Sequence, residues 1–415
     1  LHTEKMRRHI LLYATAALLT WQTARSQAIT EADVKRHISI LASDQMEGRG
    51  TGYQGAELAA KYIAGEFAKL KLQPKGDGKT YFQAFAVRNS GGHGAVDTTA
   101  RTAKNVVGYL DNGAATTVVI GAHYDHLGVG HDGGSLDPKP LGKIHNGADD
   151  NASGVAGVLE LAEFYVRNKT KEKHNFLFIC FSGEEMGLLG SKYFTEHPTV
   201  DLSATNHMLN MDMIGRLPAN NTLIVSGVGT SPAWGPVLKK HESATLQVAF
   251  DSSGVGASDH TSFYLKNIPV LHFFTGAHSD YHKPSDDADK INYPGEVAVL
   301  NYMRAVIADL DNAPRLAFAP TKTNAQSASR SMKVTLGVMP SYASDGAGMK
   351  IDAVSENKPA RKAGLLAGDV IIAIDDHAVK DVPTYMDALN HYEKGKSAQV
   401  KVKRAGEERV FTVTF

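Results

Sequence analysis

The sequence has 415 residues, and its 44 Lys and Arg balance its 44 Asp and Glu, so the formal net charge at pH 7 is zero. A chain of this length exceeds a comfortable single domain, so we expect two folded units. The charge balance shows no excess of basic residues, and we expect no nucleic-acid partner. A single cysteine, Cys180, excludes an intrachain disulfide, and its place in an apolar run predicts a thiol packed as a small apolar side chain.

The amino terminus has the parts of an export signal. Lys5–His9 is basic, Ile10–Leu19 is apolar but too short to span a bilayer, and Ser26–Ala28 supplies small residues for cleavage. An amphipathic first helix is the alternative, but the stretch is apolar on every face. We therefore predict that residues 1–28 are a signal peptide. The mature protein should be exported, periplasmic or secreted, without a membrane span.

The mature chain begins with helical spacing and continues as alternating strands and helices. Thr30–Leu72 has helical spacing interrupted at Gly48–Gly55, and Ala56–Leu70 predicts a full amphipathic helix. From Asn105 to Leu310, short apolar runs alternate with helices such as Ser153–Arg167. This alternation predicts an α/β fold with a mostly parallel mixed sheet flanked by helices.

The carboxy-terminal part differs in composition. Residues 312–330 contain two prolines and a run of small polar residues, which predicts a linker. Residues 331–415 have their own apolar strands and a helix, enough for a small α+β domain. The large domain should therefore cover residues 29–311.

Four apolar runs in the large domain are each followed by side chains that bind metal ions. They are Thr117–Ile120 before His123 and Asp125, Phe176–Phe181 before Glu184 and Glu185, Met208–Met211 before Asp212, and Ile268–Phe274 before the segment with His282. Such runs are typical of strands buried in a parallel sheet, where ligands gather beyond the carboxyl ends of the strands. The pattern predicts a two-metal hydrolase site along one sheet edge.

A fifth, acidic cluster contains Asp149 and Asp150 and precedes the helix expected from Ser153. One aspartate before a helix amino terminus is favoured by the helix dipole, but this explains only one of the two. The other can bridge two cations about 3.5 to 4 Å apart, as two-metal hydrolytic sites require.

The other candidate side chains have roles that follow from their positions. Adjacent side chains such as Glu184 and Glu185 diverge at a strand end. One can therefore bind a metal ion while the other faces the water molecule between the two metal ions. Asp212 is a lone acid in an apolar strand, and a metal ion would compensate its buried charge. Asp125 is placed to accept the second imidazole N–H of His123.

Three further histidines occupy a glycine-rich loop. His126, His131 and His145 are near enough in sequence to reach a metal ion, but they lack the anchoring of a strand. Metal sites need rigid support, so we predict that all three serve the loop.

The ordered motifs of the large domain resemble a known family. They are His123–Asp125, Gly147–Gly154, Ser182–Ser191, Asn210–Gly215 and Ser258–Phe263. Together they are similar to the co-catalytic di-zinc aminopeptidases, peptidase family M28, which also includes glutamate carboxypeptidase. The resemblance extends from about Thr30 to Leu310.

This resemblance implies a set of ligands. Matched motif by motif, one zinc would be held by His123 and Asp212, the other by Glu185 and His282, with Asp150 bridging. It also implies a Glu184 general base and a cis peptide bond from Asp150 to Asn151. The expected cofactor is two Zn²⁺ ions, with other divalent metals as the alternative.

The resemblance implies an aminopeptidase acting on peptides with a free N-terminus. Tyr281, beside His282, is the candidate hydrogen-bond donor to the oxyanion, with packing at the pocket rim as the alternative. This chain departs from some relatives, which carry a Tyr where it has Ala257. Two alternatives stay open. One is a zinc enzyme similar to the glutaminyl cyclases, and the other is a non-catalytic scaffold that binds peptides through its carboxy-terminal domain.

Some residues near the motifs suggest other roles. Ser258, Asp259 and His260 are consecutive, so they cannot align as a catalytic triad, and we expect them to scaffold the site. His278 and Asp280 are competitors of His282 for the metal. Two acids, Asp286 and Asp287, are expected behind the ligands or in a turn.

The carboxy-terminal segment resembles a PDZ domain of the bacterial protease-associated type. Met349–Val354 should be a strand, Pro359–Leu365 a short helix, Ala367–Ile374 a turn and strand, and Val382–Tyr392 the helix of the groove. The peptide-binding loop and strand would be Leu336, Gly337, Val338 and Met339. The resemblance implies a C-terminal peptide ligand added to the sheet edge, with a purely structural role as the alternative.

Overall fold

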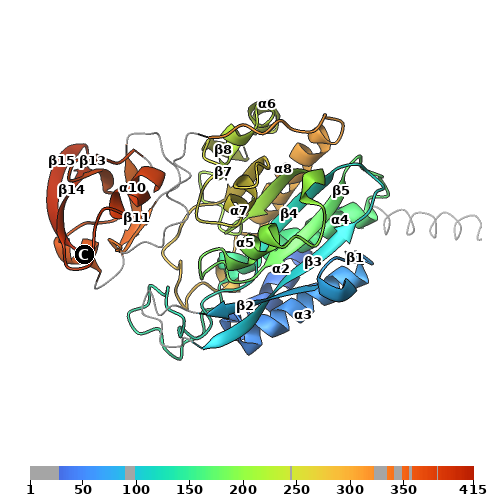
Figure 1. Cartoon of the computed structure of the whole chain (residues 1–415), viewed down its shortest axis with the longest axis horizontal. Helices are drawn as coiled ribbons and strands as arrows, with labels where there is room; N and C mark the ends of the chain where they lie inside the picture. Colours follow the sequence, from blue (N-terminus) through green and yellow to red (C-terminus); the bar gives the residue numbers. More distant parts are fainter. Residues whose placement is uncertain are drawn as a thin grey trace, which may run out of the picture.

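The computed structural model describes residues 28–88, 99–243, 245–321, 334–340, 348–354, 358–380 and 382–415. The chain forms a large and a small unit, each with its own sheet and its own apolar core (Figure 1). The predicted signal peptide falls almost entirely on residues 1–27, which lie outside the described residues. No helix among those described has the length and apolar character needed to cross a membrane.

The large unit is built on a nine-stranded mixed sheet within the described residues. Its strands are β1 (Gln73–Pro74), β2 (Phe82–Arg88), β3 (Ala100–Leu110), β4 (Thr117–His123), β5 (Asn175–Phe181), β6 (Thr205–Met211), β7 (Thr222–Ser226), β8 (Gln247–Phe250) and β9 (Val270–Phe274). They lie in the order β1-β3-β5-β4-β6-β9-β7-β8, and β2 also pairs with β3. The central strands β5, β4, β6 and β9 are parallel, which confirms the predicted mostly parallel sheet.

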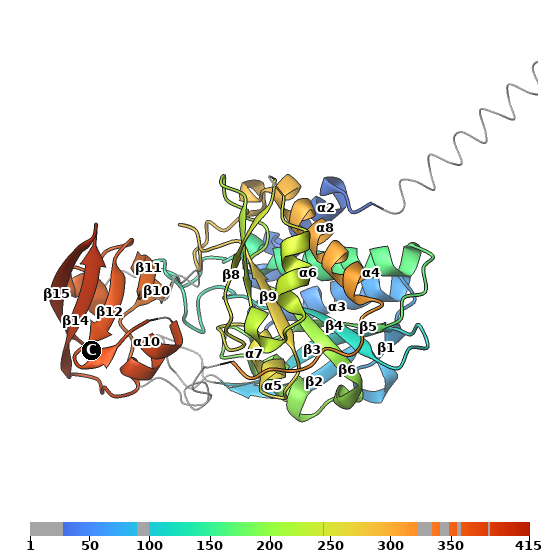
Figure 2. The ribbon, with the colours of Figure 1, turned by 90° about the horizontal axis from the view of Figure 1, so that it is seen from above.

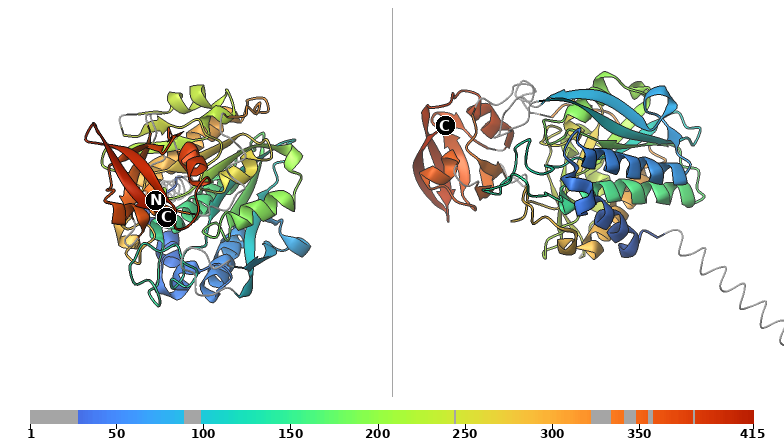
Figure 3. Two further views of the ribbon diagram at one scale, coloured as in Figure 1. Left: turned by 60° about the vertical axis from the view of Figure 1, so that its left-hand side comes forward. Right: turned by 90° about the horizontal axis from the view of Figure 1, so that it is seen from below.

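Helices cover both faces of this sheet. They are α2 (Glu31–Leu41), α3 (Gln54–Lys69), α4 (Gly154–Arg167), α5 (Leu189–Glu196), α6 (Trp234–Lys240), α7 (His260–Tyr264) and α8 (Tyr293–Leu310). Figure 2 shows α2, α4 and α8 on one side, and α5 and α7 on the other. The blue α2 and α3 both pack beside the green α4 (Figure 3).

Burial on both faces explains why the sequence of the central strand β4 is apolar without alternation. Every residue of β4 is buried. Val118 and Ile120 pack into the core under α2, α4 and α8, whereas Val119 packs with residues of α5 and α7. A strand covered on both faces gains burial from each side chain, and this produces the continuous apolar runs.

The predicted elements agree with the structure to within a few residues. The helix expected at Ala56–Leu70 is α3, and the one expected at Ser153–Arg167 is α4. Cys180 is fully buried in β5. The predicted linker begins differently, because residues 312–321 pack on the large unit: Leu316 is buried in its core and its backbone N–H donates to Asn206. Residues 322–330 lie outside the described residues.

The small unit is an antiparallel sheet with two short helices, which confirms the predicted small α+β architecture. Its strands are β10 (Val338–Pro340), β11 (Met349–Val354), β12 (Val370–Ile374), β13 (His377–Ala378), β14 (Ser397–Arg404) and β15 (Glu407–Thr414), and its helices are α9 (Pro359–Ala363) and α10 (Val382–Leu389). Gly364 ends α9 with a left-handed φ of 91°, as glycine caps do. Helix α10 is shorter than predicted and ends at Leu389.

Candidate metal centre

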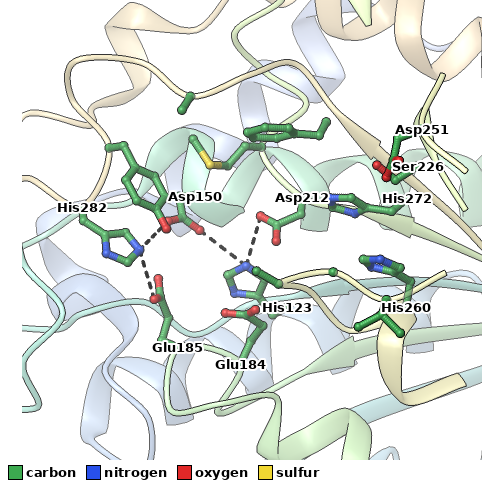
Figure 4. Close-up of a pocket in the computed structure, with 17 residues that line it drawn as sticks. His123, Asp150, Glu184, Glu185, Asp212, Ser226, Asp251, His260, His272 and His282 are labelled. Atoms are coloured by element: carbon green, nitrogen blue, oxygen red, sulfur yellow. Dashed lines mark hydrogen bonds and ion pairs between the residues drawn. The ribbon is translucent and has the colours of Figure 1, made fainter. Parts of the chain in front are cut away.

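Six predicted site residues meet at the carboxyl edge of the central strands, although they come from five segments. His123 ends β4, Glu184 and Glu185 follow β5, and Asp212 follows β6. The others, Asp150 and His282, lie in loops that reach the same edge. Figure 4 shows the six side chains converging on one pocket.

The first group of ligand atoms surrounds His123. Its Nε2 lies 3.3 Å from Oδ1 of Asp212 and 3.4 Å from Oδ1 of Asp150. One ligand atom from each of these three residues lies within 4.8 Å of the others. Two carboxylates and one imidazole at this spacing form a set that can hold a divalent cation.

The second group of candidate ligand atoms surrounds the other carboxylate oxygen of Asp150, Oδ2. Nε2 of His282 is 3.2 Å from Oδ2 of Asp150 and 3.1 Å from Oε2 of Glu185. Nδ1 of His126 is 2.8 Å from Oε1 of Glu185 and 3.7 Å from Oδ2 of Asp150. The structure thus brings two histidines to this group, and it includes His126, which we had predicted to serve the loop.

The sequence position of His126 does not show how firmly its segment is held in the structure. It follows β4 by three residues in a glycine-rich stretch, yet its side chain is buried and its backbone N–H bonds to the carbonyl of Arg49. The isolated bridge between Gly50 and His126 anchors the segment. Its Nε2 is buried without a hydrogen-bond partner among the described residues. The only sequence signal was its spacing of three residues from His123.

The loop that carries Asp150 is held by a second layer of polar groups. Oδ2 of Asp286 accepts the backbone N–H groups of Asp149 and Asp150, at 3.0 and 3.1 Å. Oδ1 of Asp149 accepts the N–H of Gly215, which joins this loop to the segment that follows Asp212. The cis peptide bond expected from Asp150 to Asn151 is present. Asp149 and Asp286 therefore hold the loop that carries Asp150 from behind.

Arg49 ties the same loop to the end of β4. Its guanidinium is fully buried and donates to four carbonyl oxygens, those of Leu41, Tyr124, Asn146 and Gly147, at 2.6 to 2.8 Å. Burial lowers the pKa of Arg49 to about 10, while Asp150 and Asp286 act in the opposite direction. The group stays charged near pH 7 and places a fixed positive charge behind the acidic loop.

Carbonyl oxygens orient two of the candidate ligand imidazoles, those of His123 and His282. Nδ1 of His123 is 3.2 Å from the backbone oxygen of Asp125 and 3.8 Å from its carboxylate. The main-chain oxygen is thus the nearer acceptor, whereas we had predicted the carboxylate. Nδ1 of His282 lies 2.9 Å from the carbonyl of Gly134. Donation from Nδ1 fixes the tautomer and directs Nε2 toward the carboxylates.

The carboxylate of Asp125 has different partners. Its Oδ2 accepts the Thr51 hydroxyl at 2.8 Å, and its Oδ1 accepts the backbone N–H of Glu184 at 3.2 Å. Asp125 is completely buried. It therefore positions the segment of Glu184 as well as lying beside His123.

The electrostatics of the centre show a strong excess of negative charge. Burial opposes charge on His123, but Asp212, Glu184 and Asp150 outweigh it and raise the pKa of this imidazole well above its ordinary value. Burial raises the pKa of Glu184 well above its usual range. For Glu185, burial acts in the same direction, but His282 and His126 lower its pKa well below that range. Groups so strongly coupled are typical of a site that binds cations.

Several other sequence candidates have partners that exclude them from these groups. His145 lies 2.7 Å from the Ser135 hydroxyl, and His131 packs edge-on against Tyr53. His278 contacts Asp149 at 3.1 Å, whereas Asp280 pairs with Arg216 and Lys290. Neither competes with His282. Asp287 accepts from Asn146 at 2.9 Å, as a turn residue would.

The consecutive Ser258, Asp259 and His260 form no triad. The Ser258 hydroxyl accepts from Asn210 of β6, and the ring of His260 stacks on His272 at 4.5 Å. Burial raises the pKa of Asp259 to about 7. Tyr281 lines the pocket, and its ring stacks on His282 with centroids 3.9 Å apart.

Comparisons with known proteins agree with this geometry. The model of peptidase family M28 matches residues 105–307, and that of the PDZ domain matches residues 334–415. Leupeptin-inactivating enzyme 1 of Streptomyces exfoliatus is 28% identical over 265 residues, which cover 62% of this chain and 52% of the relative. The probable lipoprotein aminopeptidase LpqL of Mycobacterium tuberculosis is 31% identical over 213 residues, 46% of this chain and 39% of the relative. The chain thus spans about half or less of these relatives.

Solved structures share the fold of the large unit. The zinc aminopeptidase BSAP of Bacillus subtilis has a TM-score of 0.52 at 18% identity, over 70% of this chain and 98% of that one. The glutaminyl cyclase of Bacteroides thetaiotaomicron has a TM-score of 0.53 at 18% identity, over 68% and 98%. At these identities the likeness establishes the fold alone. The family matches, the curated relatives and the shared fold together show that the chain carries a peptidase family M28 domain followed by a PDZ domain.

Proposed function

We propose that the protein is an exported aminopeptidase that removes N-terminal residues from peptides with two zinc ions. The observation that carries this proposal is the position of Asp150. Its two oxygens lie in two adjacent groups of potential ligand atoms, each with an imidazole and a further carboxylate. Several curated relatives are named aminopeptidases, and export is supported by the signal-like sequence of residues 1–28.

The donor set fits two cations. His123 and Asp212 would hold one and Glu185 and His282 the other, with Asp150 between them. Four buried or half-buried carboxylates so close together would repel one another unless cations compensated them. When bound, zinc supplies polarisation of the scissile carbonyl and a more acidic water.

Glu184 is the proposed general base. It lines the pocket between the two groups, and its backbone is fixed by the bond from its N–H to Asp125. From this position its carboxylate would take a proton from the attacking water and deliver it to the leaving amine. A raised pKa favours the second half of this shuttle, in which the protonated side chain acts as the acid.

Tyr281 is the proposed oxyanion donor. It lines the pocket beside His282, and the ring stacking between the two holds it in place. A hydroxyl at this position would donate a hydrogen bond to the negative oxygen of the tetrahedral intermediate. The neighbouring Ala257 offers no such donor, although it lines the same pocket.

The PDZ domain is proposed to bind a C-terminal peptide at Leu336, Gly337, Val338 and Met339. Gly337 has a left-handed φ of 72°, and β10 begins at the next residue. Buried Tyr385 of α10 bonds to the backbone of Leu336, which links the helix to this loop. A strand edge beside a helix is the arrangement into which a peptide can add as a further strand.

Mass spectrometry of a peptide pool tests the proposed activity. Each peptide would be present in free and N-acetylated form and incubated with zinc-loaded mature protein. Stepwise loss of single residues from the free forms alone is expected. Internal cuts would indicate an endopeptidase, and ammonia release with cyclised N-terminal glutamine would indicate a cyclase. No change would favour a peptide-binding scaffold.

A further inference from the structure

His282 is held by a loop segment that lies far from it in the sequence. Its Nδ1 donates to the carbonyl of Gly134 at 2.9 Å, and its own carbonyl accepts the N–H of Leu136 at 2.9 Å. Figure 4 shows that its Nε2 is directed at Asp150 and Glu185. The backbone of His282 has a φ of 53°, which a residue with a side chain rarely adopts without support from its surroundings. Both the ring and the backbone of His282 therefore depend on this segment.

The segment does not fix its own conformation. Gly133 and Gly134 have left-handed φ values of 86° and 82°. Glycine reaches this region without a steric cost, but it reaches many other regions as well, so these residues alone do not set the direction of the Gly134 carbonyl. Some backbone bonds nearby stay inside the same loop, such as the one from Gly142 to Val129. A contact with the rigid part of the domain is needed to hold the acceptor of His282 in place.

Asp132 supplies such a contact. Its carboxylate accepts hydrogen bonds from both terminal nitrogens of the Arg101 guanidinium at 2.9 to 3.0 Å, and its Oδ1 also accepts the Tyr53 hydroxyl at 3.3 Å. The side chains of Arg101 and Asp132 are only 8% and 11% exposed. The guanidinium also lies over the ring of Tyr53, 4.1 Å from its centroid. A charged pair with two parallel bonds is geometrically specific, so it fixes the position of the carboxylate.

The partners of Asp132 belong to the framework of the domain. Arg101 lies in β3, where it pairs with Val87 of β2. Tyr53 is the residue that precedes α3. Regular secondary structure therefore places both partners, and a residue tied to them inherits their rigidity. Because only Gly133 separates Asp132 from the next glycine, the tie acts close to the carbonyl that accepts from the imidazole.

We propose that Asp132 is a positioning residue for the metal centre. Its pairing with Arg101 sets the place of the Gly134 carbonyl. This carbonyl in turn directs Nε2 of His282 toward the second group of ligand atoms. The proposal rests on the proposed two-zinc function, in which His282 is a ligand on the side of Glu185. It assigns Asp132 to one metal ion only, because the ligands specific to the other ion end β4 or follow β6 and are placed by the sheet.

The test measures zinc binding to the full chain in competition with a chromogenic chelator. In Asp132→Asn the side chain keeps its size, but it loses its charge and turns an amide nitrogen toward the donors of Arg101. We expect the affinity for one ion to fall by about tenfold, as loss of an outer partner of a metal ligand does, while the other ion binds as before. Asp137→Asn is the matched control, since it removes an equal charge from the same loop, where Asp137 pairs with Lys143 at the surface. It should change both affinities by less than about twofold.

A double-mutant cycle with His282→Ala separates positioning from general loss of structure. His282→Ala alone is expected to remove the ion in question, so the addition of Asp132→Asn should leave the affinity of the remaining ion unchanged. General damage to the domain would weaken the remaining ion as well. Hydrogen exchange of the metal-free protein gives a second readout. The N–H of Leu136, which donates to His282, should exchange faster in Asp132→Asn and at the unaltered rate in Asp137→Asn.

Two results would overturn the inference alone: unchanged affinities for both ions in Asp132→Asn, or weakening of the ion that His282→Ala retains. In both cases the binding of two ions by the unaltered protein would leave the two-zinc proposal standing. An unaltered protein that binds fewer than two zinc ions would instead refute the two-zinc proposal, and the role of Asp132 with it.

Discussion

The two domains differ in which atoms carry their proposed functions: side-chain atoms in one and backbone atoms in the other. In the M28 domain the candidate site consists of charged side chains, and a second layer of Arg49, Asp149 and Asp286 orients them. In the PDZ domain the proposed groove consists of backbone at Gly337 and β10. Side-chain chemistry leaves a signature in residue types and spacing, whereas backbone chemistry leaves little more than a glycine. The following predictions test this contrast.

Glu184→Gln should have the largest effect. The amide keeps the size of the side chain but cannot accept a proton, so kcat should fall by about 10² to 10⁴-fold with metal content unchanged. The measurement is the initial rate on a peptide with a free amine. Metal content is measured by inductively coupled plasma mass spectrometry. Equal activity in the variant would remove Glu184 from the mechanism.

Removal of metal should affect one domain only. With free zinc at roughly 1,000 times its Kd, binding stabilises the M28 domain by about 4 kcal/mol, and a chelator removes that contribution. The PDZ domain should unfold at the same temperature with or without chelator, because its core is separate. Differential scanning calorimetry with and without EDTA makes the comparison. A shift of both transitions would show that the domains unfold together.

The roles of His126 and His282 can be separated by metal affinity. Both imidazoles approach Glu185 and Asp150, but the motif assigns only His282 as ligand. His282→Ala should abolish binding of one metal ion, whereas His126→Ala should weaken it by about 10 to 100-fold, as loss of an orienting partner does. Zinc titration against a chromogenic chelator measures both, with His131→Ala as control. The reverse order would exchange the two assignments.

Gly337→Ala should have the smallest effect on catalysis. An added Cβ at this left-handed position would meet the Cβ of Lys358 at 2.1 Å, so the peptide loop must shift. We expect kcat/KM on short peptides to change by less than about twofold, since the metal centre lies in the other domain. Binding of C-terminal peptides, measured by fluorescence anisotropy, should be lost. The matched control is Gly395→Ala, with φ of 85° and open space around it.

Much of the M28 domain was predictable because its strands are buried on both faces and its ligands follow them. The apolar runs identified β4, β5, β6 and β9, and the acids after them identified the site. Side chains that only tertiary folding brings to the site were harder to predict from the sequence. His126 has no strand of its own and was assigned to the loop, and Arg49 gave no sign that its guanidinium would be buried.

The contacts of Arg49 also set a limit on how the chain can be divided. This residue precedes the segment matched by the family model, which begins at residue 105, yet its guanidinium joins the end of β4 at Tyr124 to the carbonyls just before the acidic loop. A fragment trimmed to the matched residues would leave the carbonyl oxygens of Tyr124, Asn146 and Gly147 without this donor. The smallest transplantable unit of this domain therefore has to begin before Arg49, and a chimaera joined nearer to residue 105 would inherit the candidate ligands without the brace that aligns them.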